Sequence, residues 1–221
     1  MQQQLAQVSG KHKIFGIPFH EGLRNLVPES KVANGMLLLP HTVEVTRLAR
    51  NVGFHVPAPI VSQYDWNGDT PFRTQKITAA LLSMSPRAYV LSEMGTGKTR
   101  ASLHAVNYLI TSRTIRRALI VAPLSTLSFV WDAEIFEHFN HLSTGILHGD
   151  RAKRREVLAE EHDIYIINHD GVEILQQELI TRTDIDCIII DELSTFKNAG
   201  ANRWKAMREV LLGRKYVWGM T

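Results

Sequence analysis

From residue 87 onward, short apolar runs alternate with stretches of helical periodicity, and this alternation limits the possible folds more than any other feature. The apolar runs occupy residues 88–91, 118–122, 145–147, 164–167, 187–190 and 216–218. The helical stretches occupy residues 98–110, 126–139, 151–161, 172–180 and 202–212. Continuous apolar strands separated by helices are typical of a mostly parallel sheet covered on both faces. The sequence therefore predicts an α/β fold.

A glycine-containing loop follows the first of these strands and leads into a helix, which is the context that a phosphate-binding loop requires. Its glycines let backbone amides point at phosphate oxygens, and the helix adds its positive N-terminal end. Lys98 would reach the terminal phosphates of ATP, and the Thr99 hydroxyl would bind Mg²⁺. The strict pattern has glycine where this chain has Ser92. The predicted ATP-binding residues of the loop are Met94, Gly95, Thr96, Gly97, Lys98 and Thr99.

A second motif lies at the end of the apolar strand 187–190, where Asp191 and Glu192 follow directly. The carboxyl ends of parallel strands are where such sheets bind ligands. Asp191 would bind Mg²⁺ through water, and Glu192 would polarise the attacking water. Lys98, Asp191 and Glu192 are therefore the predicted catalytic residues, with Thr99 and Asp191 as the residues for Mg²⁺.

The order of these motifs resembles that of superfamily-2 helicases, specifically the SWI/SNF-like branch of duplex-DNA translocases, over residues 71–221. The resemblance implies a RecA-like lobe of the P-loop NTPase class. Phe72-Arg73-Thr74-Gln75 looks like the adenine-reading motif of that family. Arg73 and Gln75 are therefore expected to bind ATP, because a primary amide can donate to and accept from the adenine edge.

The resemblance also implies contacts to DNA. Val121-Ala122-Pro123-Leu124-Ser125-Thr126-Leu127 is similar to the first DNA-contact motif of the family, in which small hydroxyls bind backbone phosphates without reading sequence. Ser125 and Thr126 are the expected contacts there, whereas Trp131 is interpreted as core packing. Asn168-His169-Asp170 loosely resembles the next DNA motif, and Phe196-Lys197-Asn198 a later step. The expected DNA-binding residues are Ser125, Thr126, His169 and Lys197.

Two features depart from the family pattern. Leu193 and Ser194 follow Asp191-Glu192 where the family has Ala-His. The end of the chain, Gly219-Met220-Thr221, resembles the start of the third helicase motif, so the resemblance implies that the second RecA-like lobe and its arginine finger are missing. We expect a lobe that binds ATP and Mg²⁺ but is nearly inactive as an ATPase alone.

The segment before residue 61 differs from the rest. Residues 1–60 carry six lysines and arginines against three acidic residues, and the whole chain of 221 residues has a net charge of +3. One helix is predicted from Thr42 to Asn51, ended by Gly53, and Val56–Pro59 is predicted as an extended linker. A further helix is expected with Thr70 as N-cap and Pro71 at its first position. We therefore expect a small basic α+β appendage over residues 1–60 and an ATP-binding lobe over residues 61–221.

The cysteine content and the length of the apolar runs bear on the cellular compartment of the protein. Cys187 is the only cysteine, so an internal disulfide is impossible, and no apolar run approaches the ~20 residues of a membrane helix. These observations favour an intracellular, cytoplasmic protein that does not span a membrane. The basic run Arg151–Arg155 is interpreted as a solvated helix face, with DNA phosphates as the alternative. Two other functions remain open: an ATPase acting on RNA or protein, and a non-catalytic nucleotide-binding module.

Overall fold

The computed structural model describes residues 6–66, 70–93, 95–196, 198 and 200–221, which form two compact units, Met1–Trp66 and Asn67–Thr221. The boundary predicted at residue 60 lies inside unit 1. The linker predicted over Val56–Pro59 is wrong, because Val56 is fully buried and Pro59 begins helix α3 (Pro59–Gln63). Proline at the first helical position needs no backbone N–H, so the sequence that indicates a linker also permits a helix start.

Unit 1 contains an antiparallel sheet with the strand order β1-β2-β4-β3. The strands are β1 (Gln7–Ser9), β2 (Ile14–Pro18), β3 (Lys31–Ala33) and β4 (Met36–Pro40). Asn34 and Gly35 join β3 to β4 and both have positive φ, which matches the tight hairpin turn that this residue pair favours.

The helices α1 (Glu21–Leu26) and α2 (Val43–Asn51) complete unit 1. The helix α2 begins as predicted, since the Thr42 side chain accepts a hydrogen bond from Val45 N–H. Residues of both helices, including Leu23 and Ala49, join one apolar cluster with Phe15 and Ile17 of the sheet. The appendage is therefore a small α+β unit with its own core.

Unit 2 contains a six-stranded sheet with the order β5-β10-β9-β6-β8-β7, in which every neighbouring pair is parallel. Each strand corresponds to one of the apolar runs, so the predicted parallel sheet is confirmed. The strands are β5 (Arg87–Val90), β6 (Arg117–Ala122), β7 (Thr144–Leu147), β8 (Ile164–Asn168), β9 (Ile185–Ile190) and β10 (Tyr216–Met220).

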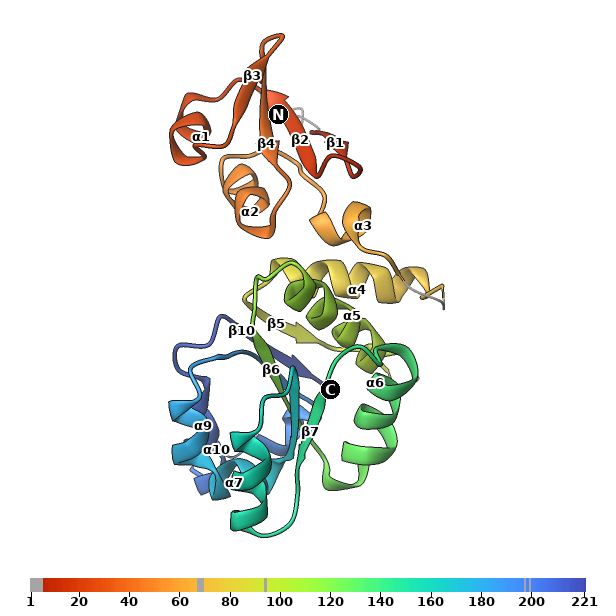
Figure 1. The fold of residues 1–221 in the computed structure, drawn as a ribbon, viewed down its shortest axis with the longest axis vertical. Coiled ribbons are helices and arrows are strands. Elements are labelled where there is room, and N and C mark those ends of the chain that lie inside the picture. The colour runs from red at the N-terminus through yellow and green to blue at the C-terminus, as the bar shows by residue number, and fades with distance from the viewer. Residues whose placement is uncertain (1–5, 67–69, 94, 197, 199) are drawn as a thin grey trace. The chain divides into compact units, whose positions relative to one another are not determined.

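Helices cover both faces of this sheet (Figure 1). On one side lie α4 (Arg73–Met84), α5 (Lys98–Thr111), the short turns η1 (Leu124–Thr126) and η2 (Leu127–Asp132), and α6 (Ala133–His138). On the other side lie α7 (Arg151–Ala159), α8 (His169–Ile174), α9 (Gln176–Thr181) and α10 (Asn202–Leu211). The turn η3 (Leu193–Phe196) follows β9. Among the described residues, no helix has the length and apolar character needed to cross a membrane.

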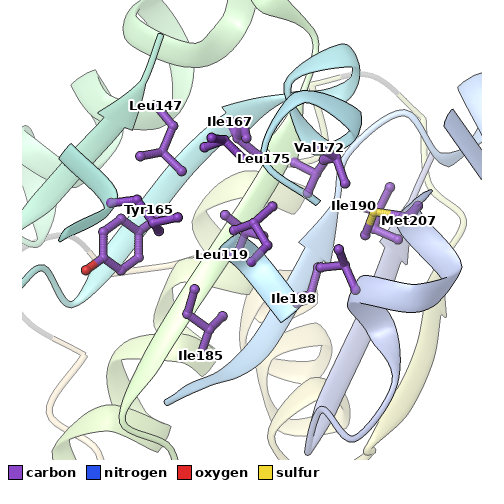
Figure 2. Packing of buried hydrophobic residues seen from close by; sticks show 14 of the residues in the cluster. Leu119, Leu147, Tyr165, Ile167, Val172, Leu175, Ile185, Ile188, Ile190 and Met207 are labelled. Carbon is purple, nitrogen blue, oxygen red and sulfur yellow. The ribbon is translucent and has the colours of Figure 1, made fainter. Parts of the chain in front are cut away.

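A hydrophobic core of unit 2 lies between the sheet and the helices α7 to α10. Figure 2 shows alternate residues of the central strands, such as Leu119 and Ile188, meeting Val172 and Met207 from the helices. At roughly 25 cal/mol per Å² of apolar surface removed from water, burial of each such side chain stabilises the fold by about 1.5–3 kcal/mol. This packing fixes the strands, and therefore the loops at their carboxyl ends.

Candidate nucleotide-binding site

The phosphate loop lies between β5 and α5, as predicted. Gly95 and Gly97 have φ values of 79° and 76°, in the left-handed region that favours glycine. Gly97 is the N-cap residue of α5, so the helix begins at Lys98 and its first amides face the loop. The two glycines therefore allow a turn that directs the N-terminal end of a 14-residue helix toward the loop. Met94 lies outside the described residues.

Lys98 folds back over the loop that precedes it. Its Nζ donates to the backbone oxygen of Ser92 and to that of Glu93, the latter over 3.2 Å. These carbonyls hold the ammonium group on the loop side of α5. A phosphate oxygen, being anionic, would compete strongly for the same donor. Lys98 is thus positioned to exchange carbonyl partners for a phosphate.

The predicted adenine motif packs against this loop. Gln75 is buried, and its Oε1 accepts a hydrogen bond of 2.8 Å from Phe72 N–H. This bond caps the start of α4, so the helix begins at Arg73 and the cap predicted at Thr70 and Pro71 is wrong. Arg73, the first residue of α4, is exposed.

Asp191 and Glu192 follow the fully buried strand β9. The Asp191 carboxylate accepts one bond from Trp131 Nε1 over 3.1 Å and a second from its neighbour's N–H over 3.2 Å. Burial raises the pKa of Asp191 above its usual range, and the Trp131 bond and the charge of Lys98 oppose that rise. The strands β5 and β9 both pair in parallel with β10, so the loop after β5 and Asp191 after β9 lie at the same edge of the sheet.

Glu192 is exposed and has a φ of 53°, which is unusual for a residue other than glycine. Backbone in this region costs on the order of 1–3 kcal/mol and persists where the surroundings hold it. The buried strand β9 supplies that restraint, since Asp191 N–H still donates to Val121 O over 2.8 Å. The chain then turns sharply and leaves the Glu192 carboxylate in solvent beside Asp191.

These residues fit a magnesium ion. Thr99 lies in the first turn of α5 and offers a hydroxyl, while Asp191 offers a carboxylate, and both are the hard oxygen groups that Mg²⁺ prefers. The neighbouring Lys98 would supply the positive charge that binding of a triphosphate requires. The site therefore combines hydrogen-bond donors for phosphate oxygens with oxygen ligands for Mg²⁺, at the carboxyl end of a parallel sheet.

The first predicted DNA motif forms the turn η1 at the end of β6. Ser125 is exposed, and Thr126 is half-buried with its hydroxyl donating to Pro123 O over 2.9 Å. Thr126 must exchange this partner before it can donate to a phosphate. Lys197 lies outside the described residues.

The structure does not support the DNA contact predicted for His169. The ring is buried, and its Nε2 lies 2.8 Å from Asp191 O, in hydrogen-bonding contact with that backbone oxygen. It also packs edge-on against Phe196, with ring centroids 5.4 Å apart. Burial lowers the pKa of His169, which favours a neutral ring. A neutral, buried imidazole that already has a protein partner is unsuited to a phosphate contact, so His169 supports the acidic motif instead.

Trp131 makes a contact with the candidate site that the sequence pattern does not predict. The predicted packing role is correct as far as burial goes, since the side chain is fully buried. Its indole N–H, however, bonds to the carboxylate of Asp191. The residue type alone indicates that a hydrogen bond exists, because the N–H of a buried tryptophan usually finds an acceptor. The identity of that acceptor follows only from the fold.

The fold and site define a P-loop nucleotide-binding lobe of the RecA-like class. The SNF2-related domain family matches residues 77–221, and the chain therefore belongs to that family. The transcription regulatory protein SNF2 of Saccharomyces cerevisiae is 32% identical over 112 residues, which are 48% of this chain and 6% of that protein.

Solved structures agree with this fold. The SWI2/SNF2 ATPase core of Sulfolobus solfataricus in complex with dsDNA matches with a TM-score of 0.59 and 22% identity, covering 69% of this chain and 32% of that chain. The core domain of the same organism matches with a TM-score of 0.55 and 20% identity, over 72% and 34% of the two chains. This chain thus spans about a third of each solved chain.

Proposed function

We propose that this chain is the ATP-binding lobe of a DNA-dependent ATPase that couples hydrolysis to movement along duplex DNA. The observation that carries the proposal is the meeting of two motifs at one edge of the sheet: the phosphate loop follows β5 and Asp191 follows β9, and both strands pair in parallel with β10. Family membership and the dsDNA complex of the Sulfolobus core support DNA as the partner.

Each residue then has a defined task. Lys98 binds the terminal phosphates of ATP, and the amides after Gly95 and Gly97 bind the phosphate oxygens. Arg73 and Gln75 recognise adenine in this proposal, since a primary amide can both donate and accept. Thr99 and Asp191 hold Mg²⁺, which neutralises charge on the phosphates when bound. Glu192 orients the attacking water and accepts its proton.

DNA contact is proposed at the turn η1. The exposed Ser125 hydroxyl can donate to a backbone phosphate, and Thr126 can join it by releasing Pro123 O. Lys197 is a further proposed phosphate contact. Such contacts position a duplex without reading its bases, so the proposed binding is independent of sequence.

Hydrolysis is proposed to need a second RecA-like lobe. In related ATPases and GTPases an arginine facing the phosphates contributes roughly 10³–10⁵ to the rate. Arg100, the first arginine after the loop, is not available for this task, because it pairs with Glu134 and His138 of α6.

The test is phosphate release by residues 1–221 at saturating ATP and Mg²⁺, with and without duplex DNA. We expect ATP binding by calorimetry and release close to background in both conditions. Turnover near the ~10 s⁻¹ typical of enzymes, without a second chain, would show that a catalytic arginine is already present. Absence of ATP binding would contradict the nucleotide site itself.

A further inference from the structure

The helix that follows the turn η1 is held against both nucleotide motifs. Its first part is the π-helical turn η2, and its second part is α6. From η2, Trp131 donates to Asp191; from α6, Glu134 and His138 contact Arg100, which immediately follows Thr99. Thr99 and Asp191 are the residues proposed to hold Mg²⁺. One helix therefore contacts Asp191 itself and Arg100, the residue next to Thr99.

The π-helical turn explains how Trp131 reaches the acid. Buried residues recur every fourth position along this helix, at Leu127, Trp131, Ile135 and Phe139. Four residues exceed the 3.6 residues of an α-helical turn, so a regular helix would rotate successive positions away from the sheet. The wider i→i+5 turn over Leu127–Asp132 offsets this rotation where it begins. Leu127 and Trp131 can then both face the sheet.

The Trp131 bond restrains a carboxylate that has few other protein donors. Apart from Trp131, the only hydrogen-bond donor to the Asp191 carboxylate among the described residues is Glu192 N–H, over 3.2 Å, and it bonds to the other oxygen. The indole N–H is 3.1 Å from Oδ2, and the ring is fully buried, so it cannot swing away into solvent. One carboxylate oxygen is thereby fixed by a rigid donor, and the orientation of the whole group follows.

We propose that Trp131 is a positioning residue that orients the Asp191 carboxylate for Mg²⁺. The proposal rests on the proposed function, because it assigns Asp191 to the metal. Outer partners of metal-binding carboxylates fix their orientation, and loss of one typically weakens metal affinity 10–100-fold. Trp131 thus acts through Asp191 and does not touch ATP.

The test compares Trp131→Phe with Trp218→Phe. Trp218 is a matched control, because it is also fully buried and donates its indole N–H, here to Ser85 O over 2.9 Å. Binding of a fluorescent ATP analogue is titrated with Mg²⁺ for each protein. We expect the half-saturating Mg²⁺ concentration to rise about tenfold or more in Trp131→Phe and to stay unchanged in Trp218→Phe. Analogue binding without Mg²⁺ should be equal in all three proteins.

A second measurement keeps Trp131 in place and so does not depend on the folding of its variant. A protein with Trp66, Trp204 and Trp218 replaced by phenylalanine retains one tryptophan. Addition of Mg²⁺ to its ATP complex should change the emission of that tryptophan, and Asp191→Asn should abolish the change.

The outcomes separate the two proposals. Equal Mg²⁺ dependence of wild type and Trp131→Phe, or equal losses in both tryptophan variants, would overturn the positioning role while leaving the nucleotide site intact. ATP binding by the wild type that shows no Mg²⁺ dependence would overturn the metal assignment of the proposed function, and the positioning role with it.

Discussion

The side-chain amide of Gln75 lies directly against the backbone of Gly97: a Cβ built on Gly97 would come within 2.1 Å of Gln75 Nε2. The other amide atom, Oε1, is already bonded to Phe72 N–H. The adenine motif and the phosphate loop are therefore packed as one unit, and any side chain at position 97 must displace Gln75.

Gly97→Ala should weaken ATP binding more than Gly95→Ala. Both glycines have positive φ, so both changes introduce backbone strain of roughly 1–2 kcal/mol, but a Cβ on Gly95 meets nothing within 4 Å. The excess effect at position 97 comes from Gln75. Calorimetric titration of the two variants measures it, and in a Gln75→Ala background the extra loss at position 97 should disappear, so the effects of Gln75→Ala and Gly97→Ala should not add. Equal losses at 95 and 97 would contradict the contact.

Lys98→Ala should lower ATP affinity by about ten- to a hundredfold. The change removes a charge-assisted contact worth roughly 1.5–3 kcal/mol. Lys153→Ala, at an exposed position in α7, is the control and should bind ATP as the wild type does. Calorimetry with ATP and Mg²⁺ decides the matter, and unchanged affinity in Lys98→Ala would remove Lys98 from the site.

Glu192→Gln should leave ATP binding nearly intact and block turnover in a protein that carries both lobes. Glutamine keeps the shape of the side chain at this left-handed position but cannot accept a proton from water. Glu173→Gln, also exposed, serves as the control. Steady-state phosphate release measures the difference, and wild-type turnover in Glu192→Gln would require another residue to act on water.

DNA binding should fall steeply with salt and be indifferent to sequence. Each neutralised phosphate contributes about 0.9 to the slope of log affinity against log salt, and contacts to the backbone carry no base information. Fluorescence anisotropy with two unrelated duplexes at several salt concentrations gives both quantities. A flat salt dependence, or a strong preference for one duplex, would refute backbone binding.

Asp184 should make stability depend on pH in acid. The Arg182 hydrogen bond lowers the pKa of Asp184 to about 2, so its stabilisation is complete above the unfolded pKa near 4 and is lost as the pH falls toward 2. Asp184→Asn should therefore have a lower free energy of unfolding than the wild type at neutral pH, and this difference should become smaller in acid. Urea unfolding at several pH values measures the difference in unfolding free energy between the two proteins.

The control for that experiment is Glu161→Gln. Glu161 pairs with Arg117, as Asp184 does, but its side chain is 89% exposed. Such a surface pair contributes little, so Glu161→Gln should match the wild type throughout. A constant gap between wild type and Asp184→Asn at every pH would show that the ionised form of Asp184 is not the source of its effect.

The sheet and the nucleotide motifs could be predicted because their signals are local. The run Ile185–Ile190 is apolar at nearly every position, and Lys98 follows its glycines at a fixed spacing. Strands of three residues, such as Gln7–Ser9 and Lys31–Ala33, are too short to show a period. For unit 1 the sequence therefore predicted the α+β fold class but not the individual strands.

Contacts between distant residues could not be predicted in this way. Arg154 lies in a basic run that indicates a solvated surface, yet its guanidinium group is buried and donates to Leu147 O and Asn168 Oδ1. The bond from Trp131 to Asp191 likewise joins residues sixty positions apart in the chain. Such pairings depend on how strands and helices align in three dimensions, which residue types alone do not specify.

The last of the described strands occupies an inner position in the sheet: β10 lies between β5 and β9, with Val217 beside both Arg87 and Ile188. During synthesis at ~5–20 residues per second, β5 must therefore wait on the order of ten seconds for its only sheet neighbour among the described strands. Until then the strand that leads into the phosphate loop has an unsatisfied edge, which is open to aggregation. The nascent protein can assemble β6 to β9 early, but the proposed nucleotide site is complete only when β10 is inserted.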